Sequence, residues 1–134
     1  MRSRNSLTLN DATAILGAAM AHARSIGRNV SIAVADDAGS PLAFQRMDGA
    51  RTYTADLAAR KARVSALVGA PTSLIEAMAK DRPQSPEMIA GAGGLPAVHG
   101  AECVGAIGVS GAKPDEDEAI ARAGLVALDP PQAP

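Results

Sequence analysis

Aromatic side chains are almost absent from this sequence. They make up 1% of it, and Phe44 and Tyr53 are the whole complement. Proteins that stack on nucleic-acid bases need such rings, and a formal net charge of −1 offers no basic surface for a phosphate backbone. We therefore expect no nucleic-acid partner. The core must be built from Ala, Val, Leu, Ile and Met, which implies thin side-chain layers and closely approaching backbones.

Cysteine and long apolar runs are equally scarce. Cys103 is the only cysteine, so no intrachain disulfide can form and a reducing compartment is permitted. No apolar run reaches the length of a signal peptide or a membrane span. We therefore expect a cytoplasmic protein with no membrane partner. A chain of 134 residues supports one core, and small domains often gain burial by homo-oligomerisation, which we expect here.

The pattern of apolar residues predicts the order α-β-β-α-α-β-β-α. The first helix follows a capping box formed by Thr8 and Asp11, continues to about residue 26 and ends at Gly27. The other predicted elements are strands over 30–36 and 41–47, helices over 52–68 and 72–80, a hairpin over 95–111 and a helix over 114–128.

Strands joined by tight turns predict an antiparallel sheet, and the helices flank it in an α+β fold. We expect a single domain over residues 7–128, with flexible tails at 1–6 and 129–134.

Three glycines recur along the last predicted strand, in the segment GAIGVSG. Gly105, Gly108 and Gly111 fit neither a dinucleotide-binding loop nor a P-loop. Glycine weakens a strand, so the missing side chains suggest that something lies directly on this backbone. A packed helix, a neighbouring chain and a flat ligand all satisfy the pattern.

Lys61 interrupts the apolar stripe of the predicted helix 52–68. It follows Leu57 by four residues and precedes Val64 by three. A lysine there either reaches water or meets a carboxylate. The carboxylates considered are Asp36, Asp37 and Asp48, all at strand ends. In the functional alternative, Lys61 and Arg46 together bind an anionic ligand.

The two histidines allow a structural and a ligand-binding interpretation. His22 lies at the flank of the apolar face of the first predicted helix, as a boundary histidine would. His99 and Glu102 share a predicted hairpin, but no second ligand pair completes a zinc site. One imidazole is enough for an axial bond to haem or to a corrinoid.

Several motifs together resemble the haem-degrading-domain or glycolate-utilisation-operon family, also described as GlcG/HbpS-like. They are VADDAGSPLAFQRMDG at 34–49, AARKAR at 58–63, APT at 70–72, GGLP at 93–96 and GAIGVSG at 105–111. The resemblance extends from about Leu7 to Leu128. The family includes the C-terminal domain of some corrinoid adenosyltransferases.

The resemblance implies a profilin-like α+β domain that assembles into dimers and rings of up to eight copies. It also implies haem or corrinoid as cofactor, with Thr72 as a haem-binding residue and His22 as the first-helix histidine. The ligand-binding residues expected on this basis and from the motifs are Thr72, Lys61, Gly94, Gly105 and Gly108.

Three functions follow as alternatives. The first is an oligomeric small-ligand-binding protein that holds haem or a related tetrapyrrole, with His22 or His99 as metal ligand. The second is a cofactor-free isomerase, lyase or hydrolase that acts on a small carboxylate, with Lys61, Arg46, Asp48 and Glu102 as candidate catalytic residues. The third is a structural oligomer without a ligand. We adopt the first and leave open whether the protein is an enzyme.

Overall fold

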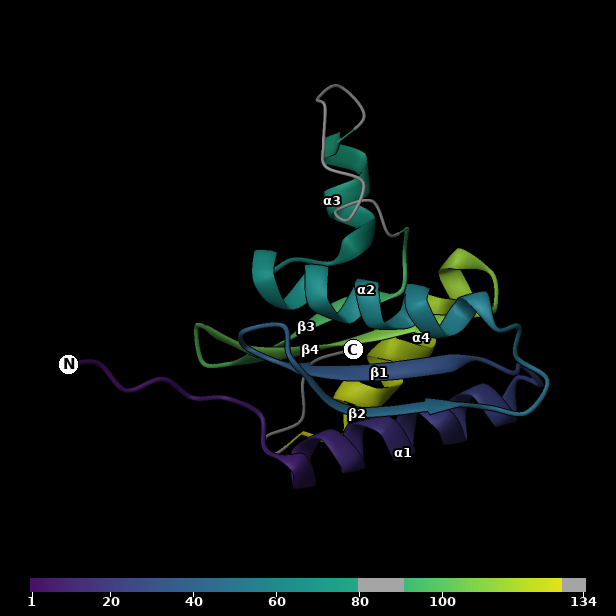
Figure 1. The fold of residues 1–134 in the computed structure, drawn as a ribbon, viewed down its shortest axis with the longest axis horizontal. Helices are drawn as coiled ribbons and strands as arrows, with labels where there is room; N and C mark the ends of the chain where they lie inside the picture. The colour runs from purple at the N-terminus through teal and green to yellow at the C-terminus, as the bar shows by residue number, and fades with distance from the viewer. Residues whose placement is uncertain (80–90, 129–134) are drawn as a thin grey trace.

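A computed structural model describes residues 1–79 and 91–128 of the chain. Its elements are α1 (Leu9–Ser25), β1 (Ser31–Asp36), β2 (Pro41–Arg46), α2 (Tyr53–Val68), α3 (Thr72–Ala79), β3 (Gly94–His99), β4 (Glu102–Ser110) and α4 (Pro114–Leu125). Within the described residues, the strands form one antiparallel sheet in the order β2-β1-β4-β3. Helix α2 covers one face of the sheet, and α1 and α4 cover the other (Figure 1). The predicted α+β class and element order are confirmed.

Most element boundaries follow local sequence signals. The Thr8 hydroxyl accepts a hydrogen bond from the Asp11 amide at 3.2 Å, and the Asp11 carboxylate accepts one from the Thr8 amide at 2.9 Å, so the predicted capping box is present. Helix α4 ends at Leu125 rather than at residue 128, because the chain tightens there into turns with i→i+3 hydrogen bonds. The predicted last residue of α3, Lys80, lies outside the described residues.

The two faces of the sheet are covered by layers of different thickness. Ile32 and Val34 of β1 belong to a large aliphatic core shared with α1 and α4. The alternate residues Ala33 and Ala35 face α2, where they meet alanines of the helix. The sequence expectation of thin alanine layers therefore holds for the α2 face, and alanines also contribute to the larger core. The larger core is made of Leu7, Ala12, Ile15, Leu16, Ala19, Ala23, Val30, Ile32, Val34, Leu95, Ala97, Val104, Ile107, Val109, Ile120, Ala121 and Leu125.

Gly108 is the point where α2 lies directly on the sheet. A Cβ atom built there would overlap the Ala58 carbonyl oxygen and lie 2.5 Å from the Ala62 nitrogen. Gly105 is approached from Leu7 instead, whose Cδ1 would lie 2.5 Å from an added Cβ. Of the explanations that the sequence left open, a packed helix accounts for Gly108.

The N-terminal residues expected to be a flexible tail contact the body of the protein. Arg4 forms an ion pair with Asp37, with 3.4 Å between Nε and Oδ2, and the Asn5 amide donates to Glu102 at 3.3 Å. The predicted tail 129–134 lies outside the described residues. No helix in the described part of the chain is long and apolar enough to cross a bilayer.

Candidate functional site

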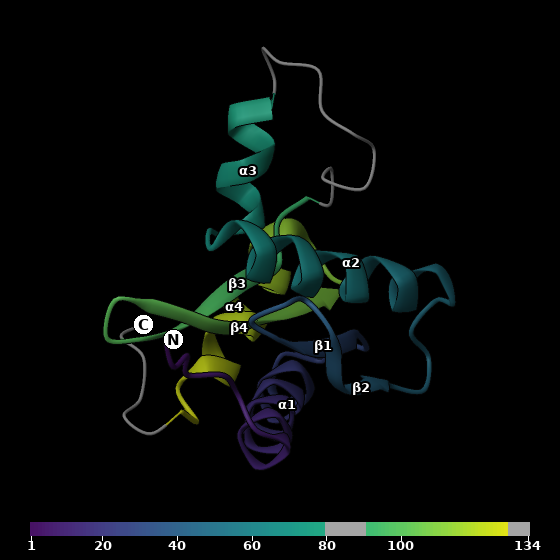
Figure 2. The same ribbon diagram turned by 60° about the vertical axis from the view of Figure 1, so that its left-hand side comes forward.

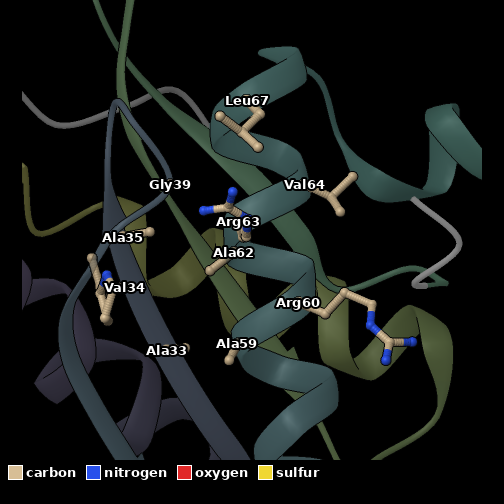
Figure 3. Close-up of a pocket in the computed structure, with 11 residues that line it drawn as sticks. Ala33, Val34, Ala35, Gly39, Ala59, Arg60, Ala62, Arg63, Val64 and Leu67 are labelled. Carbon is tan, nitrogen blue, oxygen red and sulfur yellow. The ribbon is translucent and has the colours of Figure 1, made fainter. Parts of the chain in front are cut away.

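A groove of about 530 Å³ lies between α2 and the β1–β2 hairpin (Figure 3). Its volume falls within the range of about 300–1,000 Å³ that is usual for small-molecule sites. The groove exists because α2 sits over β4 and β1, which leaves the edge strand β2 largely uncovered. Its lining residues are Ala33, Val34, Ala35, Gly39, Pro41, Ala59, Arg60, Ala62, Arg63, Val64 and Leu67.

Alanines form the floor and one wall of this groove. Ala33 and Ala35 come from β1, while Ala59 and Ala62 come from α2. Figure 3 shows Ala59 and Ala62 directed toward the strand. Ala59 is exposed, whereas Ala33, Ala35 and Ala62 are between 1% and 5% exposed.

The turn of the hairpin closes one end of the groove. The Asp36 carboxylate accepts hydrogen bonds from the amides of Ala38 and Ser40, both at 2.9 Å. Gly39 takes a left-handed conformation with φ of 80°, which favours glycine. A Cβ there would lie 3.1 Å from Cγ of Arg63, so the turn and this arginine are in contact.

The charged side chains that line the groove are basic. They are Arg60 and Arg63, and no acidic residue of the described part of the chain lines it. Neither arginine forms an ion pair with any residue in the described ranges. In Figure 3 the Arg63 side chain lies on the hairpin side of α2, whereas Arg60 extends away from the strands. Arg63 is therefore the cation best placed to meet an anionic group in the groove.

The side chain of Lys61 extends from α2 toward β4 and α4, where it forms a buried ion pair and does not line the groove. Its Nζ is 3.4 Å from Oδ2 of Asp117 and donates a hydrogen bond of 2.8 Å to the Val109 carbonyl. The two charged side chains are only 4% and 6% exposed. The partners of Lys61 proposed from the sequence are wrong, because α4 brings Asp117 to its ammonium group. Asp36 instead accepts hydrogen bonds from the amides of its own turn, and Asp37 pairs with Arg4. Asp48 lies beyond the end of β2 and is exposed.

Burial dominates the electrostatics of this pair. It lowers the pKa of Lys61, an effect that the Asp117 carboxylate partly offsets. Burial likewise raises the pKa of Asp117, against the opposing effects of Lys61 and of the Ala112 and Gly111 amides. The pair joins α2 to the first turn of α4, so its geometry is that of a structural link.

Lys61 is one of the expected ligand-binding residues, and three others lie around it. The Thr72 hydroxyl, in a residue only 2% exposed, accepts a hydrogen bond of 2.9 Å from the Gly94 amide. A Cβ on Gly94 would lie 2.6 Å from the Lys61 carbonyl oxygen, and one on Gly108 would lie 3.0 Å from Cβ of Lys61. These residues pack on one another, and none of them lines the groove. Gly105 lies apart from them, against Leu7.

The remaining expected site residues are distributed over other parts of the surface. Arg46 and Asp48 line a separate pocket of about 450 Å³ at the end of β2, together with Arg24 of α1. His99 lies in a smaller pocket near Leu7. The other two are His22, half-buried on α1, and Glu102, exposed at the start of β4. Among the described residues, no three His, Cys, Asp or Glu side chains gather where they could hold a metal ion.

Sequence reasoning missed the groove and its arginine. The segment AARKAR does contain a signal, because Ala59, Ala62 and Arg63 recur at three- and four-residue spacing and so share a helix face. That face carries no large apolar residue until Leu67. The pattern alone therefore does not indicate that this face forms the wall of a groove.

The fold defines a class of small α+β domains in which an antiparallel sheet lies between helices, and here one of these helices borders a groove. Residues 7–126 match the family model described as haem degrading protein HbpS-like. Protein GlcG from Escherichia coli strain K12 is 35% identical over 114 residues, which cover 82% of this chain and 85% of that protein. The chain belongs to the HbpS-like family, as the resemblance in its sequence indicated.

Solved structures agree with this assignment. A double mutant of HbpS from Streptomyces reticuli is 39% identical, with a TM-score of 0.87 over 96% of this chain and 90% of that one. Protein ORFY from Klebsiella pneumoniae is 25% identical, with a TM-score of 0.91 over 98% of this chain and 97% of that one.

Proposed function

We propose that this protein binds haem or a closely related tetrapyrrole in the groove between α2 and the β1–β2 hairpin. The observation that carries the proposal is the combination of an alanine lining with Arg63 at its edge, which forms no ion pair with any described residue. Haem is a planar, mostly apolar macrocycle with two propionate groups, so it presents a face for the alanines and carboxylates for a guanidinium. Membership of a family described by haem degradation supports the same ligand class.

A haemin titration followed by absorbance tests the proposal. The wild-type protein should give a saturable Soret change with one haemin per groove. Ala59 is exposed on the groove wall, so Ala59→Phe should fill the groove without burying new bulk in the core, and affinity should fall at least about tenfold. Arg63→Gln removes the guanidinium and should also weaken binding about tenfold, since hydrogen bonds between charged groups are the strong ones.

Matched controls separate the groove from general surface effects. Ala21→Phe places the same bulk on an exposed position of α1, and Arg51→Gln removes an exposed arginine that does not line the groove. Both should bind haemin as the wild type does. Non-saturating Soret changes, equal in all five proteins, would show only adventitious haemin and would reject the proposal.

The alternative of an enzyme acting on a small carboxylate retains one supporting observation. Arg46 and Asp48 share their pocket with Arg24, and this pocket could accept a carboxylate. Lys61 and Glu102, the other two residues of the expected catalytic set, do not line it. We therefore place this function second.

We also propose that the protein acts as a homo-oligomer, between a dimer and an octamer. Support comes from the family resemblance and from large apolar side chains exposed at the end of α2 and along α3. They are Leu67, Val68, Leu74 and Met78, between 47% and 63% exposed. The cytoplasmic location and the single-domain bounds 7–128 remain predictions.

A further inference from the structure

The strand β2 lies at one edge of the sheet, and no described segment of the chain pairs with its outer side. Natural edge strands are often protected by a proline, a bulge or a charge. The opposite edge strand, β3, contains Pro96 and a register shift between Ala97 and Val98. In β2 the proline and the register shift both lie at the start, near Pro41, and residues 43–46 pair regularly with β1. The edge of β2 is therefore the one better able to accept another strand.

The hydrogen-bond register shows which backbone groups of β2 face outward. The Met47 amide donates to the Val30 carbonyl at 3.0 Å, so these two residues form a hydrogen-bonded pair. Along antiparallel strands such pairs alternate with pairs that are not hydrogen-bonded. By this alternation, Phe44 and Arg46 belong to the pairs of β2 with β1 that are not hydrogen-bonded. Their amide N–H and carbonyl groups therefore point away from β1, toward the open edge.

The side chains of Phe44 and Arg46 lie on the α2 face of the sheet. Arg46 stands opposite Ser31 in the register, and a hydrogen bond of 2.9 Å joins the hydroxyl of Ser31 to that of Thr54 on α2. Phe44 is one of the two aromatic residues of the chain, and it is 45% exposed. Arg46 is exposed and forms no ion pair with any described residue. A strand added at this edge would thus meet an apolar ring and, two residues further along, a positive charge.

Further arginines surround this edge of the sheet. Arg63 lines the groove beside the hairpin, and Arg24 shares with Arg46 the pocket at the end of β2. None of these three arginines forms an ion pair within the described ranges, although Asp48 also lines the pocket at the end of β2. Charge complementarity therefore favours an acidic partner over a neutral or basic one.

We propose that the edge of β2 binds an extended, acidic segment of a partner protein, which joins the four-stranded sheet as an additional strand. In this mode of recognition, main-chain hydrogen bonds supply affinity and alternate side chains supply specificity. In the antiparallel orientation, an acidic residue stands opposite Arg46, and an apolar residue two positions later stands opposite Phe44. The segment recognised is therefore acidic-x-apolar. This binding does not depend on which ligand the groove holds.

Fluorescence anisotropy of the full chain with synthetic peptides tests this proposal. The probe is the fluorescein-labelled peptide Gly-Thr-Glu-Thr-Val-Thr-Gly, in which Glu and Val take the places opposite Arg46 and Phe44. N-methylation of Glu and Val removes the two donors that face β2, so it should weaken binding at least about tenfold. N-methylation of the two Thr residues that flank Val is the matched control. Their amides face away from β2, so the Kd should stay within about threefold.

A second comparison tests the charge. A peptide with Gln in place of Glu should bind about two- to fivefold more weakly, as expected for the loss of an exposed ion pair. Arg46→Gln should remove this difference between the two peptides. Arg51→Gln changes an exposed arginine that lies outside β2 and should preserve the difference.

Amide hydrogen exchange locates the contact. With saturating peptide, the amides of Phe44 and Arg46 should exchange at least about tenfold more slowly, whereas the Gln45 amide, which faces β1, should not change. A parent peptide that does not saturate the protein would overturn the proposal. So would binding that is insensitive to N-methylation and is displaced by a short oligothymidylate, because the surface would then respond to negative charge alone. Slow exchange at Phe44 and Arg46 that rises with protein concentration in the absence of peptide would assign the edge to a second copy and would equally overturn it.

Discussion

At the scale of single residues, the buried charge of Lys61 is the feature with the largest energetic consequence. Its ammonium group has lost water and gained the Asp117 carboxylate and the Val109 carbonyl. Removing one member of such a pair leaves the other as an uncompensated buried charge. The anomaly itself is readable from the sequence, because Lys61 stands in an apolar stripe. Its partner is not, since Asp117 lies 56 residues further along and only the tertiary fold brings it there.

Single and double variants should reveal this dependence. Lys61→Met should lower the free energy of unfolding by about 3–5 kcal/mol, because it strands the Asp117 carboxylate. In Lys61→Met with Asp117→Asn, the amide can still accept the Ala112 hydrogen bond that Asp117 accepts at 2.9 Å, and no charge is buried. The double variant should therefore be more stable than Lys61→Met alone. Urea unfolding of the wild type, Lys61→Met, Asp117→Asn and the double variant measures the four free energies of unfolding. Additive losses would contradict the coupling.

At the scale of elements, helices and strands follow from caps, turns and periodicity, but their lateral placement does not. Gly69, with φ of 75°, ends α2 as expected from the sequence, and the capping box begins α1. The offset of α2 toward β4 depends on Gly108, and the groove depends on that offset. A strand glycine indicates a close approach without identifying what approaches. For this reason the groove could not be placed from the sequence.

A methyl group at Gly108 should therefore disturb the packing of the whole helix α2 on the sheet. Gly108→Ala would push backbone against backbone at Ala58 and Ala62, so we expect it to lower the free energy of unfolding by about 1–3 kcal/mol, as overpacking does. Gly17 provides the matched control, because it lies on α1 with nothing within 4 Å of an added Cβ. Gly17→Ala should stabilise the protein by about 0.5–1 kcal/mol through helix propensity. Equal effects of the two substitutions in urea unfolding would argue against close packing at Gly108.

At the scale of the whole molecule, α3 projects from the layered body (Figure 2). Ile75 is buried on it, while Leu74 is 50% and Met78 is 63% exposed. Composition predicted an oligomer, because small domains often bury further apolar surface by association. It could not indicate which surface of the protein forms the interface. Within the described residues, α3 contacts the other elements less than any other helix does.

Mass measurement tests whether α3 mediates association. The wild-type protein should sediment as a multiple of its 13.5 kDa mass. Replacing Leu74 and Met78 by lysine should shift it to the monomer, because two charges would then have to be desolvated at the interface. Leu9→Lys changes an apolar residue that is 61% exposed on α1 and should leave the assembly intact. A monomeric wild type would contradict the proposed oligomer, and an unchanged assembly in the α3 variant would move the interface elsewhere.

The alanine floor of the groove has one more consequence, and it concerns entropy. A methyl side chain has no rotamers, so Ala33, Ala35, Ala59 and Ala62 lose no freedom when a ligand arrives and cannot swing to close the groove when it leaves. Most of the side-chain entropy lost on binding should come from Arg63, whose rotamer entropy corresponds to about 2 kcal/mol. If the proposed ligand binds there, the alanines of the groove should keep the same conformation before and after binding.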